Sequence, residues 1–171
     1  MPTPVKRLYN SLLRPHLPRK IAVYNGVPVR NVKLLDTTDE FPDYEAPLVE
    51  AIRRRVRPGD AVTIVGGGLG VGSVVAARAA GIDGTVQTFE ASESGCRLIR
   101  ETLVLNRATD LVDLTHAIVG DAVDVHGPID GAIELAPEDL PEGDVLVLDC
   151  EGAELGIMTG RDLSERVVVV E

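Results

Sequence analysis

The sequence predicts an α/β protein built on a Rossmann-like, doubly wound and mostly parallel sheet. From residue 60 onward, short apolar runs rich in β-branched residues alternate with segments of helical periodicity. This alternation favours parallel strands joined by right-handed crossovers. Five glycines occur within residues 66–72, directly after the first apolar run. Aromatic residues make up 3% of the chain, so the core must be aliphatic, which suits a parallel sheet buried on both faces.

The composition argues against several classes of binding partner. With 171 residues, the chain is long enough for one domain with a sizeable core. Its formal net charge of −10 argues against nucleic acid as a partner, because nucleic acid binds to basic surfaces. The chain has no apolar run of membrane-spanning length and no signal-peptide pattern, so we expect no membrane partner and a cytoplasmic location. Cys96 and Cys150 lack the spacing of a metal-binding pair, and we predict no metal site.

Two regions are expected along the chain, an N-terminal extension over residues 1–43 and a main domain over residues 44–171. The dipeptide Asn25-Gly26 lies between two apolar runs and is the preferred two-residue turn of a β-hairpin. Pro28 has no backbone N–H to donate, so the second hairpin strand is expected at a sheet edge.

Hydrophobic periodicity and chain-breaking residues predict the other elements. Residues 36–43 predict a polar loop, and residues 44–57 predict a helix because apolar residues recur there every four positions. The glycine-rich segment is followed by a predicted helix up to residue 80. Later helices are expected over 91–106 and 151–158, and strands over 61–65, 86–90, 111–119, 145–149 and 167–171, with 129–135 either a short strand or irregular.

The glycine loop after the first of these strands indicates a bound ligand. No Gly-Lys-Ser/Thr sequence ends it, so it is not a phosphate-binding P-loop. The dinucleotide pattern G-x-G-x-x-G fails as well, because its sixth position is Val71 when counted from Gly66 and Ser73 when counted from Gly68. The pattern that fits is G-x-G-x-G, ending at Gly70. It resembles the first motif of class I S-adenosylmethionine (SAM) methyltransferases.

A second interpretation is that the loop belongs to a short-chain dehydrogenase, because the spacing of Gly66, Gly70 and Gly72 resembles that family as well. Those enzymes need a Tyr-x-x-x-Lys pair. None of the three tyrosines of this chain is followed by a lysine four residues later, which nearly excludes this reading.

An acidic residue, Glu90, ends the strand that follows the loop helix. It lies 20 residues beyond Gly70. A carboxylate at that place is well positioned to accept hydrogen bonds from the two ribose hydroxyls of an adenosine ligand.

A longer motif resembles one particular family. The run Asp149-Cys150-Glu151-Gly152-Ala153-Glu154 matches Asp-x-Glu-Gly-x-Glu, the characteristic sequence after the fourth strand of FkbM-type SAM-dependent methyltransferases. Together with residues 86–90 and 103–106, it extends the resemblance over about residues 44–171. The resemblance implies a class I methyltransferase fold, SAM as cofactor, and O-methylation of a hydroxyl on a sugar or other small metabolite.

The resemblance also implies roles for individual residues. Methyl transfer is an in-line displacement that needs alignment, and a weakly nucleophilic hydroxyl benefits from a nearby base. Asp149 is the first candidate for that base and Glu151 the second. The other implied contacts are Gly66, Gly68 and Gly70 with the methionine and ribose of SAM, Glu90 with the ribose, His116 and Ala117 with the adenine, and Glu154 and Glu171 with the acceptor.

Two departures from the family pattern are visible. Ile64 stands where the family often has an acid that contacts the amino end of SAM. Two further strands would normally complete the sheet, and we expect either a shortened chain or a partner, such as a second copy, over the exposed edge. The alternative function is therefore a non-catalytic or incomplete SAM-binding module with the same fold.

Overall fold

The computed structural model describes residues 9–170, except 121–128, 130, 151 and 165. Its centre is a six-stranded sheet in the order β7-β6-β5-β4-β8-β9, and every neighbouring pair is parallel. The strands are β4 (Ala61–Val65), β5 (Thr85–Glu90), β6 (Val112–Val119), β7 (Ile133–Leu135), β8 (Val145–Leu148) and β9 (Val167–Val170). The strand order reverses between β4 and β8, which confirms the doubly wound prediction and puts the ligand crevice of such folds at their carboxyl ends.

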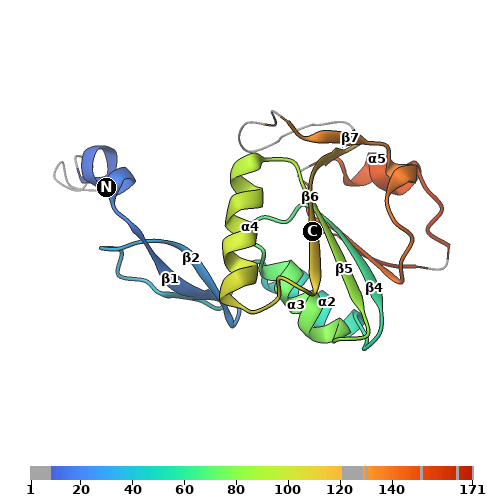
Figure 1. Cartoon of the computed structure of the whole chain (residues 1–171), viewed down its shortest axis with the longest axis horizontal. Helices are drawn as coiled ribbons and strands as arrows, with labels where there is room; N and C mark the ends of the chain where they lie inside the picture. Colours follow the sequence, from blue (N-terminus) through green and yellow to red (C-terminus); the bar gives the residue numbers. More distant parts are fainter. Residues whose placement is uncertain (1–8, 121–128, 130, 151, 165, 171) are drawn as a thin grey trace.

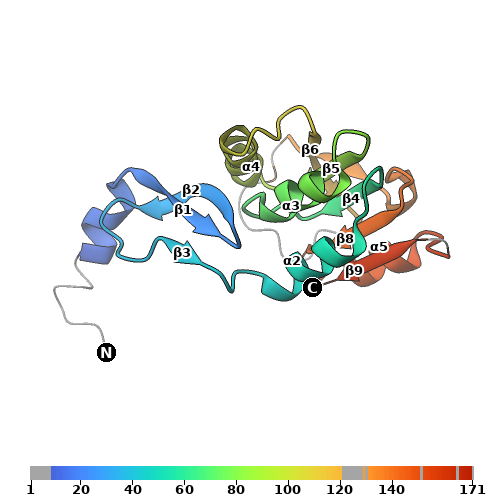
Figure 2. The ribbon, with the colours of Figure 1, turned by 90° about the horizontal axis from the view of Figure 1, so that it is seen from below.

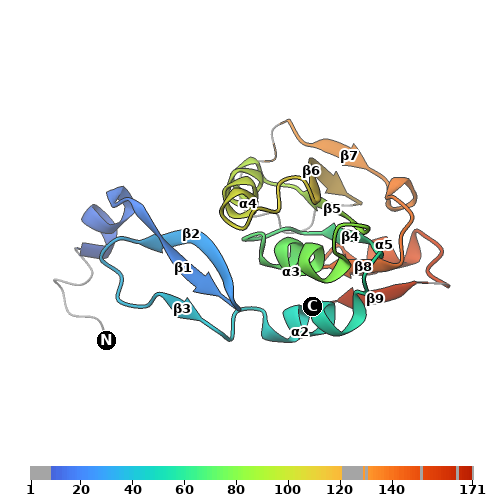
Figure 3. The ribbon, with the colours of Figure 1, turned by 60° about the horizontal axis from the view of Figure 1, so that its bottom comes forward.

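Helices cover both faces of the sheet (Figure 1). They are α2 (Ala46–Arg55), α3 (Val71–Ala80), α4 (Glu93–Leu105) and α5 (Glu154–Thr159), with short turns η1 (Tyr9–Leu13), η2 (Arg14–His16) and η3 (Pro137–Asp139). One aliphatic core lies between the sheet and α2, α3 and α4 and includes buried residues of the N-terminal hairpin, and a second lies between the sheet and α5. Figure 3 shows α3 between α2 and β4. The strand β8 has the sequence Val-Leu-Val-Leu and is buried throughout, as expected for a central parallel strand.

The N-terminal extension forms a small sheet of its own, whose strand β2 packs beside α3 and α4 (Figure 2). The strands β1 (Arg19–Tyr24) and β2 (Val27–Lys33) form the predicted hairpin, and both residues of its turn have positive φ, 48° at Asn25 and 82° at Gly26. Pro28 lies on β2, at an edge, as predicted. The polar loop expected over residues 36–43 is wrong in part, because β3 (Glu40–Phe41) pairs parallel with β1 there.

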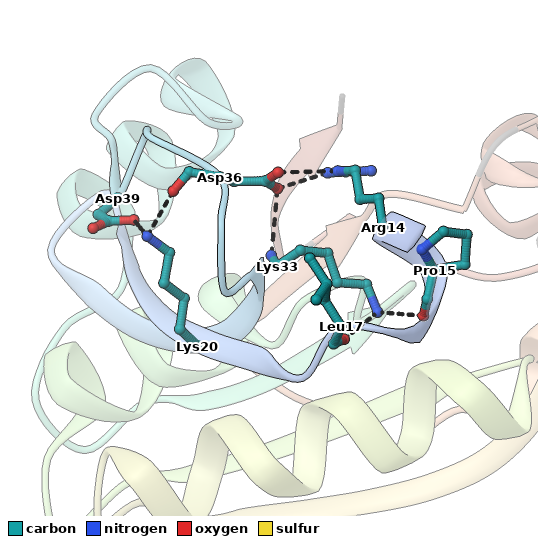
Figure 4. Close-up of polar contacts among 7 residues, drawn as sticks. All are labelled: Arg14, Pro15, Leu17, Lys20, Lys33, Asp36 and Asp39. Carbon is teal, nitrogen blue, oxygen red and sulfur yellow. Dashed lines mark hydrogen bonds and ion pairs between the residues drawn. The ribbon is translucent and has the colours of Figure 1, made fainter. Parts of the chain in front are cut away.

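Polar contacts fasten the start of the described chain to the hairpin (Figure 4). The Arg14 guanidinium donates to both carboxylate oxygens of Asp36, at 3.0 and 2.7 Å, and holds the pKa of that carboxyl below its usual value. The Lys33 ammonium donates to the carbonyls of Pro15 and Leu17, at 3.0 and 3.1 Å. All of these residues belong to the N-terminal extension, and none lies at the carboxyl ends of the central strands.

Three helices begin later than predicted. The helix α4 starts at Glu93 instead of residue 91, because Ser92 has an extended backbone and caps the helix by accepting from the Gly95 amide. The helix α2 starts at Ala46 instead of residue 44, because Glu45 has a left-handed backbone with φ 44°. The helix α5 starts at Glu154 instead of residue 151, because Gly152 has φ 107°, which a right-handed helix cannot include. No helix of the described part is long and apolar enough to cross a membrane.

Candidate functional site

The glycine loop joins β4 to α3 at the carboxyl edge of the sheet. The first residue of the loop is held against β5, because the Gly66 amide donates to the Phe89 carbonyl at 2.9 Å. Gly66 has φ 87°, and a Cβ there would lie 1.7 Å from the carbonyl oxygen of Asp149. Glycine is therefore required at this position both for its backbone angle and for the direct contact between the ends of β4 and β8.

Gly68 is the exposed residue of the loop. Its φ is 51°, and among the described residues a Cβ built on it would meet the Tyr44 hydroxyl at 3.6 Å and a Glu45 carboxylate oxygen at 4.0 Å. A Cβ on Gly67 would instead lie 2.4 Å from the end of the Ile99 side chain, inside the protein. A ligand can therefore approach the main chain of the loop at Gly68, beside the N-terminal end of α3.

Glu90 points its carboxylate at this loop. One oxygen accepts from the amides of Gly67 and Gly68, at 3.1 and 3.3 Å, and the other accepts from the amide and hydroxyl of Ser92, at 2.8 and 3.0 Å. The predicted acid thus lies at the mouth of the glycine loop, with the strand end and the loop in contact. Its role toward a ribose stays a prediction.

The next strand brings His116 beside Glu90, since the two residues are register partners on β6 and β5. The His116 ring Nε2 lies 3.0 Å from the Ala91 carbonyl, and because a carbonyl only accepts, this nitrogen carries the proton. Ala117 is buried in the core on the α5 face. If both residues border an adenine as predicted, His116 can contact it with its imidazole ring, and Ala117, whose side chain is buried, can contact it only with its backbone.

The carboxyl end of β8 brings Asp149 against the loop. Its amide donates to the Val65 carbonyl at 2.9 Å, and its carbonyl oxygen is the atom that a Cβ on Gly66 would strike. Asp149 therefore lies next to the glycine loop, and its role as a base stays a prediction. The predicted residues Glu151 and Glu171 lie outside the described residues.

Glu154 is turned to its own loop. Its carboxylate oxygens accept from the amides of Cys150 and Gly152, at 3.0 and 2.8 Å. Burial alone would raise the pKa of Glu154, but these backbone donors outweigh it and hold the pKa below its usual value. Burial and the neighbouring Glu154 raise the pKa of the Cys150 thiol to about 12, so this cysteine stays protonated at neutral pH.

We expect Glu154→Ala to destabilise the chain by about 1–3 kcal/mol at pH 7, because two backbone donors lose a charged acceptor. The folded carboxyl has the lowered pKa, so its contribution is present above its unfolded pKa of about 4.3 and is lost as the pH falls through the folded pKa. Thermal melts of both proteins should therefore converge on acidification.

The matched control is Glu142→Ala, because that side chain is 96% exposed. It should change the stability by less than about 0.5 kcal/mol. An equal effect of the two substitutions would show that Glu154 does not hold the loop.

Sequence reasoning missed two residues at this site, Tyr44 and Glu45, which it assigned to the predicted helix. Tyr44 is half-buried and packs edge-on against Tyr24, with ring centroids 5.1 Å apart. Its backbone carbonyl accepts from the side-chain amide of Asn25. Burial and a hydrogen bond to Glu45 raise the pKa of Tyr44, so the phenol stays neutral. No local sequence pattern identifies Tyr44 and Glu45 as site residues, because only tertiary packing brings Gly68 close to them.

Other candidate sites are weaker. Among the described residues, no group of three or more His, Cys, Asp or Glu side chains is arranged to hold a metal ion. A cavity of about 340 Å³ lies between the N-terminal sheet and α2, and Asn25, Gly26, Phe41 and Arg53 are among its lining residues. It does not include the glycine loop.

Comparison with known proteins gives a fold but no family. No family model and no curated protein matches this chain. Among solved structures, precorrin-6y C5,15-methyltransferase from Geobacter metallireducens is 20% identical, with a TM-score of 0.54, over 83% of this chain and 66% of that one. Trm5b from Pyrococcus abyssi is 14% identical, with a TM-score of 0.51, over 78% of this chain and 33% of that one.

A SAM-dependent O-methyltransferase from Thermotoga maritima is 23% identical, with a TM-score of 0.47, over 62% of this chain and 35% of that one. This chain thus spans between 33% and 66% of the length of these three proteins. With its parallel six-stranded sheet, the chain has the class I SAM-dependent methyltransferase fold. The resemblance to the FkbM family stays a prediction.

Proposed function

We propose that this chain binds SAM at the glycine loop and transfers its methyl group to a hydroxyl of a sugar or other small metabolite, as in FkbM-type enzymes. The observation that carries the proposal is the open face of Gly68, with the Glu90 carboxylate at the mouth of the same loop. When bound, SAM supplies an electrophilic methyl group on a sulfonium. Cofactor, chemistry and cytoplasmic location are all part of this proposal.

The residues present fit SAM better than a dinucleotide. The main chain at Gly68 can be approached directly, and the Glu90 carboxylate can accept hydrogen bonds from a ribose. Glu45, Glu90 and Asp149 put three carboxylates around the loop. These charges favour the cationic sulfonium and repel the pyrophosphate of NAD or the phosphates of ATP.

The protein's part in the reaction is alignment and proton removal. Asp149 adjoins the loop at the end of β8 and is our candidate for the base that takes the proton of the acceptor hydroxyl. Glu151 stays the second candidate. A SAM-binding module without catalysis is the second candidate function, because the Glu154 carboxylate is engaged by its own loop.

The exposed edge of the sheet supports a proposal about assembly. The strand β9 carries valine at all four positions and pairs with β8 on one side. An uncharged edge strand of this kind favours pairing with another chain. We keep a homodimer through this edge as a proposal, which light scattering in solution would test.

Isothermal titration calorimetry with SAM, S-adenosylhomocysteine (SAH), NAD and ATP tests the cofactor directly. SAM and SAH should bind with dissociation constants below about 1 mM, the usual upper range for enzyme substrates. NAD and ATP should not bind in that range. Absence of SAM and SAH binding would contradict the proposal, and binding without methyl release to any hydroxyl acceptor would favour the non-catalytic module.

The variant Gly68→Ala should separate cofactor binding from folding. A Cβ would enter the open space where the ligand is proposed to lie, so we expect SAH affinity to fall about tenfold or more, equivalent to about 1.4 kcal/mol. Stability should fall by only about 1–2 kcal/mol, from the left-handed backbone. Gly59→Ala is the control, because Gly59 has φ 91° and no described atom within 4 Å of its Cβ position, but precedes β4 at the end of that strand opposite to the loop. That variant should keep SAH affinity unchanged.

A further inference from the structure

We propose that Glu45, positioned by Tyr44, binds the α-ammonium group of the methionine portion of SAM. This inference rests on the proposed function, since it assumes SAM at the glycine loop, and it adds which residue recognises the amino-acid end of the cofactor. In this arrangement, the carboxylate that binds the ammonium group belongs to the residue preceding α2, and not to the strand before the loop.

The strand before the loop offers no such group. Ile64 is 3% exposed and belongs to the core between the sheet and α2, α3 and α4. Its neighbours on β4 are apolar except Thr63, which is buried. A cationic ligand end over the loop must therefore find its carboxylate on another element.

Glu45 lies over the exposed part of the loop. In the part of the chain that the structure describes, and outside the loop itself, the Tyr44 hydroxyl and the Glu45 carboxylate are the groups within 4 Å of the point where a Cβ of Gly68 would stand. A ligand that rests on the main chain of Gly68 meets these two side chains first. An ammonium group at that point can form a charge-assisted hydrogen bond with Glu45.

The arrangement of the two acids around the loop sets the orientation of the ligand. Glu90 approaches from β5 and contacts the Gly67 and Gly68 amides, while Glu45 approaches from the start of α2. The ribose and the ammonium of SAM lie at opposite ends of its sulfonium centre. With the ribose on the Glu90 side, the amino-acid end extends toward Glu45.

The surroundings hold Glu45 in place. Tyr44 keeps its proton, because burial and the contact with Glu45 raise its pKa, and it can therefore act as a neutral partner of the carboxylate. Tyr44 is itself held by Asn25 and Tyr24 of the hairpin. The backbone of Glu45 has φ 44° and ψ 38°, an uncommon conformation for a residue with a side chain. The N-terminal extension thus positions the pair over the loop.

The test compares ligands with and without the group in question. SAH, an SAH analogue in which hydrogen replaces the α-amino group, and 5′-methylthioadenosine, which lacks the amino-acid end, are titrated into wild type and Glu45→Gln. We expect wild type to bind the des-amino analogue about tenfold or more weakly than SAH, the range of a charge-assisted hydrogen bond. Glu45→Gln should lose a similar factor for SAH and should bind 5′-methylthioadenosine as wild type does.

Two further variants sharpen the comparison. Glu50→Gln removes a charge from α2 at an exposed position that pairs with Arg54, and it should bind SAH as wild type does. Tyr44→Phe keeps the ring that packs on Tyr24 and removes the hydroxyl, so it should weaken SAH binding less than Glu45→Gln.

Each outcome has one meaning. Equal affinity of wild type for SAH and the des-amino analogue overturns the inference, and this measurement needs no variant to fold. Equal loss of SAH and 5′-methylthioadenosine in Glu45→Gln overturns it too, since the residue would then shape the site in general. If wild type binds none of the three ligands, the proposed function itself fails, and this result is distinct from the other two.

Discussion

Replacing Gly66 by alanine is expected to cost most of the stability of the fold. The added Cβ would lie 1.7 Å from the Asp149 carbonyl oxygen and 2.5 Å from its carbon, and both are main-chain atoms that cannot move aside without separating β4 from β8. The left-handed φ of 87° adds strain of about 1–2 kcal/mol. We expect a loss above about 4 kcal/mol, which is exceptional for one substitution. Denaturant unfolding would measure it.

A glycine with nearly the same φ provides the control. Gly59 has φ 91°, and a Cβ there would meet no atom of the described residues within 4 Å. Gly59→Ala therefore carries the strain without the collision and should cost only about 1–2 kcal/mol. Equal losses for the two variants would mean that the contact with Asp149 does not determine the glycine at position 66.

Replacing Glu90 by glutamine is expected to give the largest loss of cofactor affinity. The carboxylate accepts four hydrogen bonds, from Gly67, Gly68 and Ser92, and a ribose would compete for the longer ones, at 3.1 and 3.3 Å. An amide would turn its NH₂ group toward donors and could accept at only one atom. We expect SAH affinity to fall about 10- to 100-fold, equivalent to roughly 1.4–2.8 kcal/mol.

This loss should extend to 5′-methylthioadenosine, because that ligand keeps the ribose. Calorimetry with both ligands measures it. Glu93→Gln is the control. Glu93 lies three residues after Glu90, is exposed on α4 and pairs with Arg97. The control should bind both ligands as wild type does. Unchanged SAH affinity in Glu90→Gln would remove Glu90 from the site.

Much of the central sheet could be predicted, because β4 and β8 are short apolar runs with a glycine within two residues of one end, so local sequence determines them. The strand β3 could not, because Glu40 and Phe41 are placed by pairing with β1 and by the stacking of Phe41 on Tyr24, with centroids 4.5 Å apart. A two-residue strand has no periodicity of its own.

The candidate site divides in the same way. Glu90 and Asp149 could be predicted because each follows a strand whose carboxyl end must face the crevice. Glu154 could be located but not interpreted, since an acid at that position suits either a ligand or the amides of its own loop. The sequence places Tyr44 and Glu45 in a helix, and only the tertiary packing beside the loop brings them to Gly68.

The most direct test of the account is a titration of the isotopically labelled chain with SAH, followed through its amide resonances. We predict that the largest shifts occur at Gly67, Gly68 and Ser92, whose amides surround the Glu90 carboxylate. Unshifted loop amides at saturating SAH, or shifts confined to the cavity at Gly26 and Arg53, would contradict a cofactor held by the glycine loop.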